Sequence, residues 1–477
     1  ETVRIALTVA ALNDLQVKAS DIQNAYLSSP CEEKIYTELG PEFGPDAGKK
    51  AIIVRALYGL KSAGSSFGRH LADCMRTIGY VPCKADPDLW IKPVTRPDDG
   101  LKYYSYVLLY VDDALAIHHD AESVLWELDK FFPMKKGSIG DPDMYLGAKL
   151  RQVQLDNGVF AWAMSASKYV KEAVSNIERQ LREKYGGRAL PKRATAPWRS
   201  DYVSELDETE ELNPKDAQFY QSMVGILHWM VELGRVDMIT EVSLLASHMA
   251  LPRQGHLDQI LHTFAYLKSH NNARMVFDPT YPEIDQSKFQ THDWTRLYGD
   301  VKEPIPEDAL EPRGKPVDLR MNVDSDFAGE KLTRRSRTGY FIFLNSALIA
   351  WLSKRQTTVE TSVFGSEFVA MKQGVDALRG IRYKLRMMGI PITGPTYIQG
   401  DNMSVIHNTQ RPESTLKKKS NAVCYHAVRE SVAMGESLTG HVDTGDNCAD
   451  LATKTIPGGS KRNHLVGKLL YDICDHC

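Results

Sequence analysis

The first third of the chain combines helical and alternating hydrophobic patterns. Apolar residues recur at helical spacing over residues 3–15, and a short strand pattern follows at residues 16–20. Residues 57–77 again predict a helix. The run 103–119 is rich in Tyr, Val and Leu on both sides of an Asp-Asp pair. This run predicts two strands joined by an acidic turn, a β-hairpin.

The pattern becomes mainly helical over residues 141–279. A strand pair is expected near residues 145–162, and two packed helices are expected at residues 220–250 and 256–270. The stretch 186–214 is rich in Pro, Arg, Ser and acidic residues, which indicates an exposed connector.

The last part of the chain has an α/β pattern. Residues 278–319 carry six prolines and many charges, which indicates a linker or a long surface insertion. Strands are then predicted at residues 319–324, 339–345 and 396–400, and a helix at residues 362–388.

Composition excludes several classes of protein. The chain is 43% hydrophobic and 25% charged, which is typical of a folded globular protein and not of a disordered one. No apolar stretch reaches the roughly 18 residues of a membrane span, so no membrane partner is expected. Seven cysteines in 477 residues argue against a secreted disulfide framework. Cys474 and Cys477 have C-x-x-C spacing without a second pair, which does not favour a zinc site. The start at Glu1 indicates a piece of a longer precursor.

The net charge of −3 gives no global attraction for a polyanion, so such a partner needs local basic patches. The candidate patches are Lys331, Arg334, Arg335 and Arg337, and residues 417–419. These side chains can contact phosphates, or they can form an ordinary solvated face.

A first group of carboxylates lies at the predicted hairpin. Asp112 and Asp113 are adjacent like charges, which a fold tolerates best when solvent or a cation neutralises them. Taken alone, the dipeptide is ordinary turn chemistry. Asp21, however, ends another predicted strand, and carboxylates from two adjacent strand ends can hold a pair of Mg²⁺ ions for in-line phosphoryl transfer.

Short motifs around these residues resemble the copia-type retrotransposon polyprotein in its reverse transcriptase and ribonuclease H region. In the N-terminal half the motifs are Asp21-Ile22-Gln23-Asn24-Ala25-Tyr26-Leu27, Leu57-Tyr58-Gly59-Leu60-Lys61, Asp86-Pro87-Asp88-Leu89-Trp90, Tyr110-Val111-Asp112-Asp113 and Tyr145-Leu146-Gly147. In the C-terminal half they are Asp324-Ser325-Asp326-Phe327-Ala328-Gly329, Trp351-Leu352-Ser353-Lys354-Arg355-Gln356, Asp401-Asn402-Met403-Ser404 and Ala449-Asp450-Leu451-Ala452-Thr453-Lys454. The motifs follow one another in the order of that family.

The resemblance implies an α+β reverse-transcriptase palm with truncated fingers and a helical connector, followed by an α/β ribonuclease H-like domain. The implied parts are a palm with partial fingers (1–150), a thumb or connection region (151–277), a linker or insertion (278–318), the ribonuclease H-like domain (319–460) and a C-terminal tail (461–477).

The resemblance also implies roles for palm residues. Asp21 and Asp112 would be direct metal ligands, and the catalytic Asp113 would support the hairpin tip. Tyr26 would lie under the incoming sugar, or else be a core aromatic. Gly59 and Lys61 would approach the template and the nascent base pair, where small residues let the backbone come close.

A second group of carboxylates stands on separate elements of the C-terminal half. Each one alone is an ordinary surface acid, but together they resemble the ribonuclease H set that holds two metal ions. The set is Asp324, Glu367, Asp401 and Asp450. Asp326 and Asp446 are nearby acids that we do not expect to act as ligands.

The implied activity is RNA-directed DNA synthesis with cleavage of RNA in RNA–DNA hybrids, with Mg²⁺ at both sites and Mn²⁺ as a substitute. The implied partners are an RNA template, a DNA primer, the hybrid, deoxynucleoside triphosphates and other segments of the same polyprotein. The family also implies virus-like particles in the cytoplasm and a nuclear stage.

Three departures from the family pattern keep an alternative open. Basic fingers strands are not found upstream, Ser62 and Gly64 replace the usual Gln and Pro, and Lys419-Ser420-Asn421-Ala422 replaces a Lys-His-Ile-Asp stretch. A role for His426 in the nuclease step stays open. The alternative is a catalytically inactive retroelement remnant that folds and binds nucleic acid without turnover.

Overall fold

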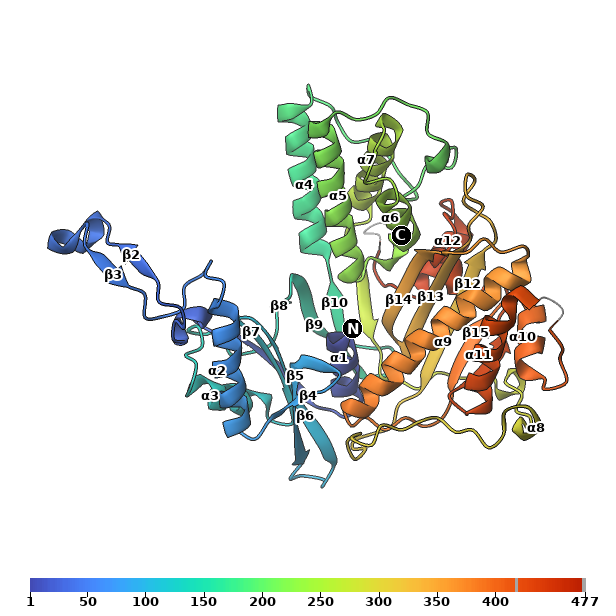
Figure 1. The fold of residues 1–477 in the computed structure, drawn as a ribbon, viewed down its shortest axis with the longest axis horizontal. Helices are drawn as coiled ribbons and strands as arrows, with labels where there is room; N and C mark the ends of the chain where they lie inside the picture. The colour runs from blue at the N-terminus through green and yellow to red at the C-terminus, as the bar shows by residue number, and fades with distance from the viewer. Residues whose placement is uncertain (417–418, 474–477) are drawn as a thin grey trace.

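The computed structural model describes residues 1–416 and 419–473. Lys417 and Lys418 of the second basic patch, and the Cys474–Cys477 motif, therefore lie outside the described residues. An N-terminal sheet, a group of helices and a C-terminal α/β domain surround the first helix, α1 (Thr2–Leu12) (Figure 1).

The N-terminal sheet is antiparallel, with the strand order β1-β7-β6-β5-β4. Its strands are β1 (Gln16–Asp21), β4 (Val81–Cys83), β5 (Asp86–Thr95), β6 (Lys102–Tyr110) and β7 (Asp113–His118). The predicted hairpin is confirmed as β6 and β7. The predicted helix at residues 57–77 begins later, as α2 (Ala63–Thr77).

Both faces of this sheet are buried, because alternate side chains of its strands belong to two different hydrophobic cores. On β7, Leu115 and Ile117 share a core with α1, while Ala114 and Ala116 share a core with α2 and α3 (Ala121–Asp129). Because successive side chains point to opposite faces of a strand, one apolar run supplies both cores. Both strands of the hairpin are therefore held from two sides.

A thin two-stranded ribbon projects from this part of the molecule (Figure 1). It consists of β2 (Tyr36–Glu38) and β3 (Lys50–Ile52), which the hydrophobic pattern did not predict because their side chains are largely exposed. Short 3-10 turns flank these and other elements: η1 (Ala25–Ser28), η2 (Pro41–Asp46), η3 (Ser204–Leu206), η4 (Val236–Met238), η5 (Gln286–Lys288), η6 (Lys419–Asn421) and η7 (Cys448–Ala452).

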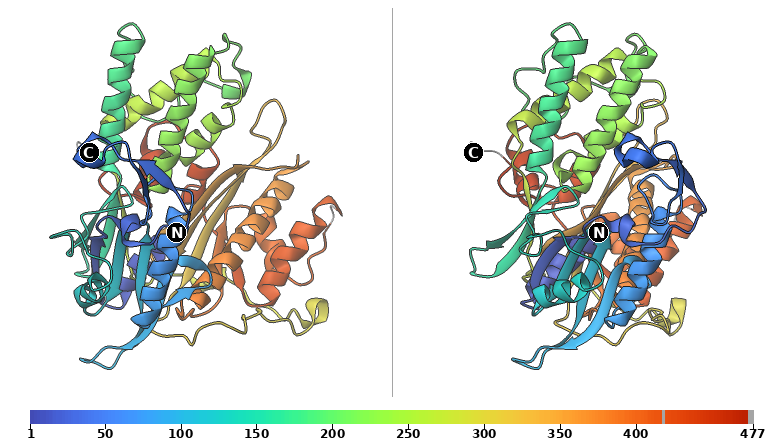
Figure 2. Two further views of the ribbon diagram at one scale, coloured as in Figure 1. Left: turned by 60° about the vertical axis from the view of Figure 1, so that its left-hand side comes forward. Right: turned by 90° about the vertical axis from the view of Figure 1, so that its left-hand side faces the viewer.

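A second antiparallel sheet carries the helices that stand above both large sheets in each view of Figure 2. Its strands are β8 (Met144–Tyr145), β9 (Ala148–Gln154), β10 (Phe160–Ser165) and β11 (Arg274–Phe277). The helices are α4 (Ser167–Lys184), α5 (Pro214–Glu232), α6 (Ile239–Ala246) and α7 (Gln254–Ser269). The single helix predicted at residues 220–250 is wrong: the chain turns at Gly234, whose φ of 106° a side chain would disfavour.

The C-terminal sheet is mixed, with the strand order β14-β13-β12-β15-β16. The strands are β12 (Leu319–Asp326), β13 (Arg337–Leu344), β14 (Ala347–Arg355), β15 (Thr396–Gly400) and β16 (Ser437–His441). The β12–β15 and β15–β16 pairs are parallel and the others antiparallel. The accompanying helices are α9 (Val363–Met387), α10 (Met403–Gln410), α11 (Ala422–Ala433) and α12 (Ser460–Gly467). This is the α/β arrangement expected of a ribonuclease H-like domain.

Several long-range contacts join these parts into one core. Arg4 on α1 donates to the carbonyl of Ile349 at 2.7 Å and lies 4.0 Å over the ring of Trp351. The Tyr106 hydroxyl on β6 donates to the carbonyl of Met388, just after α9, at 2.8 Å. The segment 278–318, with the short helix α8 (Thr295–Tyr298), runs along the α/β domain (Figure 1). No helix within residues 1–416 or 419–473 is long and apolar enough to cross a bilayer.

Two candidate active sites

The turn between β6 and β7 is a strained two-residue connection. Tyr110 pairs with Asp113, which leaves Val111 and Asp112 as the turn. Val111 has a φ of 56°, a conformation that β-branched residues rarely adopt. The turn is tied to the end of β1, because the Ile22 amide donates to the carbonyl of Asp112 at 2.7 Å. Two distant parts of the chain are thus fixed together at this turn.

The expected palm carboxylates gather at this point. Asp21 is the register partner of Asp113 across β1 and β7, and Asp112 lies exposed at the turn. Burial raises the pKa of Asp113 to about 6, and the charges of Asp21 and Asp112 add to the effect. The Nζ of Lys135 lies 3.7 Å from Asp21 Oδ2. A divalent cation would relieve the repulsion in this group, so the residues fit the expected metal.

Tyr26 lies in an aromatic group next to the strand end of Asp21. Its ring centroid is 4.5 Å from that of Tyr58 and 5.9 Å from that of Phe67. Gly59, with a φ of 95°, and the exposed Lys61 follow Tyr58 in the loop before α2. The structure therefore brings the three expected nucleotide-binding residues into one neighbourhood.

The C-terminal sheet brings three acidic side chains together near the carboxyl ends of β12 and β15. Asn322 pairs with Gln399 in the parallel β12–β15 ladder, so Asp324 and Asp401, each two residues further on, reach the same level. Glu367 comes from the beginning of α9. Ligand oxygens of Asp324, Glu367 and Asp401 all lie within 4.8 Å of one another. We call these three residues the nuclease triad, after the activity that the family resemblance implies for them.

The electrostatics of the nuclease triad favour a cation. Asp324 is 1% exposed, and its Oδ1 has no hydrogen-bond partner among residues 1–416 and 419–473. Burial raises the pKa of Glu367 to about 9, and the charges of Asp324 and Asp401 add to the effect. A buried carboxylate oxygen without a partner is costly. The residues therefore fit a divalent metal ion with oxygen ligands.

Asp450, the expected fourth ligand, is held differently. It is fully buried in η7, and both of its oxygens accept from lysines: Oδ1 from Lys454 at 2.5 Å and Oδ2 from Lys461 at 2.8 Å. Lys454 Nζ also lies 3.1 Å from Asp324 Oδ2. The Thr453 hydroxyl donates to the same oxygen of Asp324. The structure thus brings three of the four expected ligands together and pairs the fourth with two ammonium groups.

The chain is similar in sequence to several known proteins. Residues 1–184 match the family described as reverse transcriptase (RNA-dependent DNA polymerase). The Pol polyprotein of transposon RE1 from Arabidopsis thaliana is 24% identical over 95% of this chain and 27% of its own length. That of transposon TNT 1-94 from Nicotiana tabacum is 25% identical over 96% of this chain and 31% of its own length. The resemblance to copia-type Pol polyproteins is confirmed.

The chain spans less than a third of the length of these Pol polyproteins. Among solved structures, a foamy viral protease–reverse transcriptase in complex with an RNA/DNA hybrid is 11% identical, with a TM-score of 0.42. The match covers 91% of this chain and 45% of that one. The structure itself has the expected order, an α+β part followed by a helical region and an α/β domain.

Other acidic residues of the chain lie apart from the nuclease triad. Asp326 accepts from the Arg337 amide at 2.8 Å, and Asp446 accepts from His464 at 2.8 Å and from Lys468 at 2.5 Å. His426 shares a hydrogen bond of 2.9 Å with the Tyr298 hydroxyl, from the 278–318 segment. These contacts give the three side chains partners outside the triad.

The prediction that Lys331, Arg334, Arg335 and Arg337 form a basic patch is wrong at Arg337, the first residue of β13. Arg337 is buried and donates to the Ser243 hydroxyl at 2.6 Å, so it is not available to phosphates. Lys331, Arg334 and Arg335 carry no such restriction, because they are exposed or partly exposed.

Two lysines of the site were not assigned a role from the sequence. The contact of Lys454 with Asp450 could have been predicted from the sequence, because residues four apart in a helical turn lie side by side. The contact of Lys461 with Asp450 could not, since Lys461 lies on a separate helix, α12, whose position depends on tertiary packing.

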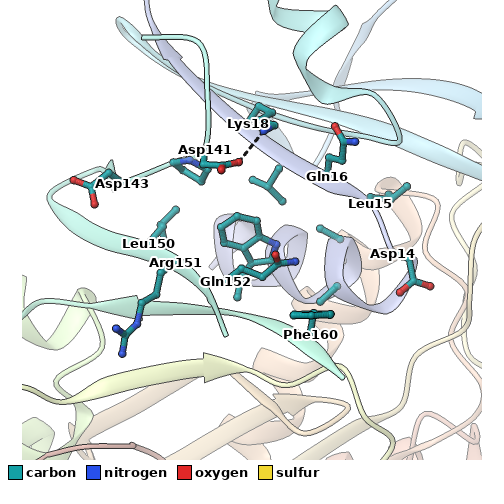
Figure 3. Close-up of a pocket in the computed structure, with 15 residues that line it drawn as sticks. Asp14, Leu15, Gln16, Lys18, Asp141, Asp143, Leu150, Arg151, Gln152 and Phe160 are labelled. Atoms are coloured by element: carbon teal, nitrogen blue, oxygen red, sulfur yellow. Dashed lines mark hydrogen bonds and ion pairs between the residues drawn. The ribbon is translucent and has the colours of Figure 1, made fainter. Parts of the chain in front are cut away.

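A hollow of about 670 Å³ lies between β1 and the β9–β10 hairpin (Figure 3). Its polar lining includes Gln16, Lys18, Asp141 and Arg151, and Lys18 Nζ lies 2.7 Å from Asp141 Oδ1 across it. Neither group of site carboxylates contributes to its lining. The hollow therefore marks the junction of the two N-terminal sheets and not a candidate active site.

Proposed function

We propose that this chain is the RNA-directed DNA polymerase and ribonuclease H part of a copia-type retrotransposon Pol polyprotein. The observation that carries the proposal is the nuclease triad with its unpartnered Asp324 oxygen, on a chain whose first 184 residues match reverse transcriptases. We assign the palm to residues 1–150, the connection to 151–277, the insertion to 278–318, the nuclease to 319–460 and the tail to 461–477.

In the polymerase site, Asp21 and Asp112 would hold Mg²⁺, with Mn²⁺ as a substitute. When bound, the cations would neutralise charge that develops during phosphoryl transfer. Asp113 would support the turn from its register position opposite Asp21. Tyr26 would pack under the sugar of the incoming nucleotide, and a bulky ring there excludes a 2′-hydroxyl group. Gly59 and Lys61 would approach the nascent base pair.

In the nuclease site, Asp324, Glu367 and Asp401 would hold the cation, and Asp450 would be the fourth ligand of the set. The metal would supply activation of a water molecule and stabilisation of the leaving oxygen. Asp324 and Glu367 are buried and Asp401 is half-buried, and the three stand in β12, in α9 and directly after β15.

One substrate links the two sites. Copying an RNA template from a DNA primer with deoxynucleoside triphosphates leaves an RNA–DNA hybrid, and a tethered nuclease removes the RNA strand. The other segments of the polyprotein, virus-like particles in the cytoplasm and a nuclear stage belong to the same proposal, by resemblance to the family.

The test is an assay on one labelled DNA primer annealed to RNA, with Mg²⁺, that scores extension and RNA cleavage together. We expect Asp112→Asn to abolish extension and leave cleavage intact, and Glu367→Gln to do the reverse. Asp446→Asn is the matched control and should keep both activities. If the unmodified chain binds the hybrid tightly but shows neither activity in Mg²⁺ or Mn²⁺, the enzyme proposal is wrong and the inactive remnant replaces it.

A further inference from the structure

The nuclease site contains two lysines that the family resemblance did not assign, and their side chains are partly exposed: 41% for Lys454 and 50% for Lys461. Lys454 lies between two carboxylates, 2.5 Å from Asp450 Oδ1 and 3.1 Å from Asp324 Oδ2. Lys461 approaches the other oxygen of Asp450 at 2.8 Å. Both oxygens of Asp450 are therefore occupied, whereas Oδ1 of Asp324 has no partner in the part of the chain that the structure describes.

The charges of this site leave room for one divalent cation. When all are ionised, the nuclease triad and Asp450 carry four negative charges, and Lys454 and Lys461 return two positive charges. The remaining two negative charges match a single divalent cation. Because buried charges need near-complete compensation, a second divalent cation would leave an excess of positive charge while both lysines stay in place.

We propose that Lys454 occupies the place of a second divalent cation between Asp324 and Asp450, so that the free nuclease site binds one cation at the triad. Asp450 becomes available as a ligand only when Lys454 moves away. The proposal deepens the nuclease function proposed above and rests on it.

The position of Lys454 also indicates what displaces it. Lys454 lines a groove of about 300 Å³ between residues 198–205 and the α/β domain. Lys331, Arg337 and Arg355 line the same groove together with the acids Glu205, Asp326 and Glu330, so with Lys454 the groove has one more basic than acidic residue. A nucleic-acid backbone in this groove presents phosphate oxygens that compete with the two carboxylates for the ammonium group of Lys454. Binding of the hybrid therefore couples to release of Asp450.

The experiment counts bound Mn²⁺ by electron paramagnetic resonance of the free ion, in a chain carrying Asp21→Asn and Asp112→Asn to silence the polymerase site. In this background we expect one tight Mn²⁺ per chain. Adding Lys454→Met should create a second Mn²⁺ site, tighter by about tenfold or more than any second site before the change, because a close positive charge is removed.

Two further variants separate this effect from a general loss of charge. Lys454→Arg keeps a cation between the carboxylates and should retain one Mn²⁺. Lys461→Met removes one partner of Asp450 but leaves Lys454 in place, so it should also retain one Mn²⁺. A hybrid whose RNA strand carries 2′-O-methyl groups, which block cleavage, should raise the count from one to two without any lysine change. Circular dichroism and thermal melting establish that each variant is folded.

Two outcomes overturn the inference without touching the nuclease function. They are two tight Mn²⁺ ions in the free silenced background, or a single one in folded Lys454→Met. A different outcome would overturn the nuclease function as well: no Mn²⁺ bound in the folded silenced background or in any lysine variant, with or without the hybrid.

Discussion

Hydrogen bonds to Glu303 connect the 278–318 segment with helix α9. Its two carboxylate oxygens accept from Arg382 Nε and Nη2, both at 2.7 Å, and from Arg386 Nη1 and Nη2 at 2.6 and 2.7 Å. Its own amide donates to the carbonyl of Met434 at 3.2 Å. Two forked guanidinium groups on one carboxylate form the strong, charge-assisted kind of hydrogen bond.

Replacing Glu303 with Gln removes this charge and should loosen the segment. Burial alone would raise the pKa of Glu303, but the hydrogen bonds from Arg382 and Arg386 outweigh it and lower the pKa from 4.5 to about 2. At 1.36 kcal/mol per pKa unit the shift corresponds to about 3 kcal/mol. Solvent screening of a partly exposed pair reduces this to about 2 kcal/mol. Local opening should therefore become about thirtyfold more frequent in Glu303→Gln at pH 7.

The pH dependence has a definite sign. Because folding lowers the pKa of Glu303, its stabilisation is complete above about pH 5 and is lost as the pH falls toward 2. Integrating over the two pKa values leaves about two-fifths of the effect at pH 3, which is about a fourfold difference in opening.

Amide hydrogen exchange of peptides that contain residue 303 measures this opening, since the amide of Glu303 is itself hydrogen-bonded. Glu311→Gln is the matched control on the same segment: the side chain of Glu311 is 76% exposed and pairs with its near neighbour Arg313, so no change is expected. Equal acceleration at pH 7 and pH 3, or none at pH 7, would refute the reasoning.

Three further substitutions test other parts of the molecule. A Cβ at Gly339 would lie 2.7 Å from Thr453 Cγ2, so Gly339→Ala should displace the turn beside the nuclease triad; hybrid cleavage should be lost while primer extension remains, and parallel loss of both would contradict this. Gly389 has a φ of 69° and no room for a Cβ against the ring of Tyr104, so Gly389→Ala should cost roughly 1–3 kcal/mol in urea unfolding. Burial raises the pKa of Glu241 to about 7, so the folded state loses stability as the pH rises from about 4.5 to 7. Glu241→Gln should then melt at a higher temperature than the unmodified chain at pH 8 but not at pH 5, and a lower melting temperature at pH 8 would count against this account.

Elements with a strong local pattern could be predicted from the sequence. The β6–β7 hairpin is one, because an apolar run broken by a polar turn has few other ways to fold. β14 and β16 were missed. The β16 run Ser437–His441 is short and only partly apolar, and its parallel partner, β15, stands far away in the chain. Pairing of this kind depends on long-range packing that a local pattern does not contain.

The sequence by itself determined which residue types were available for chemistry: two sets of carboxylates, in an order that resembles one family. Only the tertiary structure decided how those carboxylates are used. The parallel pairing of β12 with β15 sets Asp324 and Asp401 at one level, and α9 adds Glu367. The folding of α12 against η7 gives Asp450 a lysine from outside its own motif. The physical reason is that charge compensation depends on distance in space, and distance in space between remote residues is fixed by packing and not by spacing along the chain.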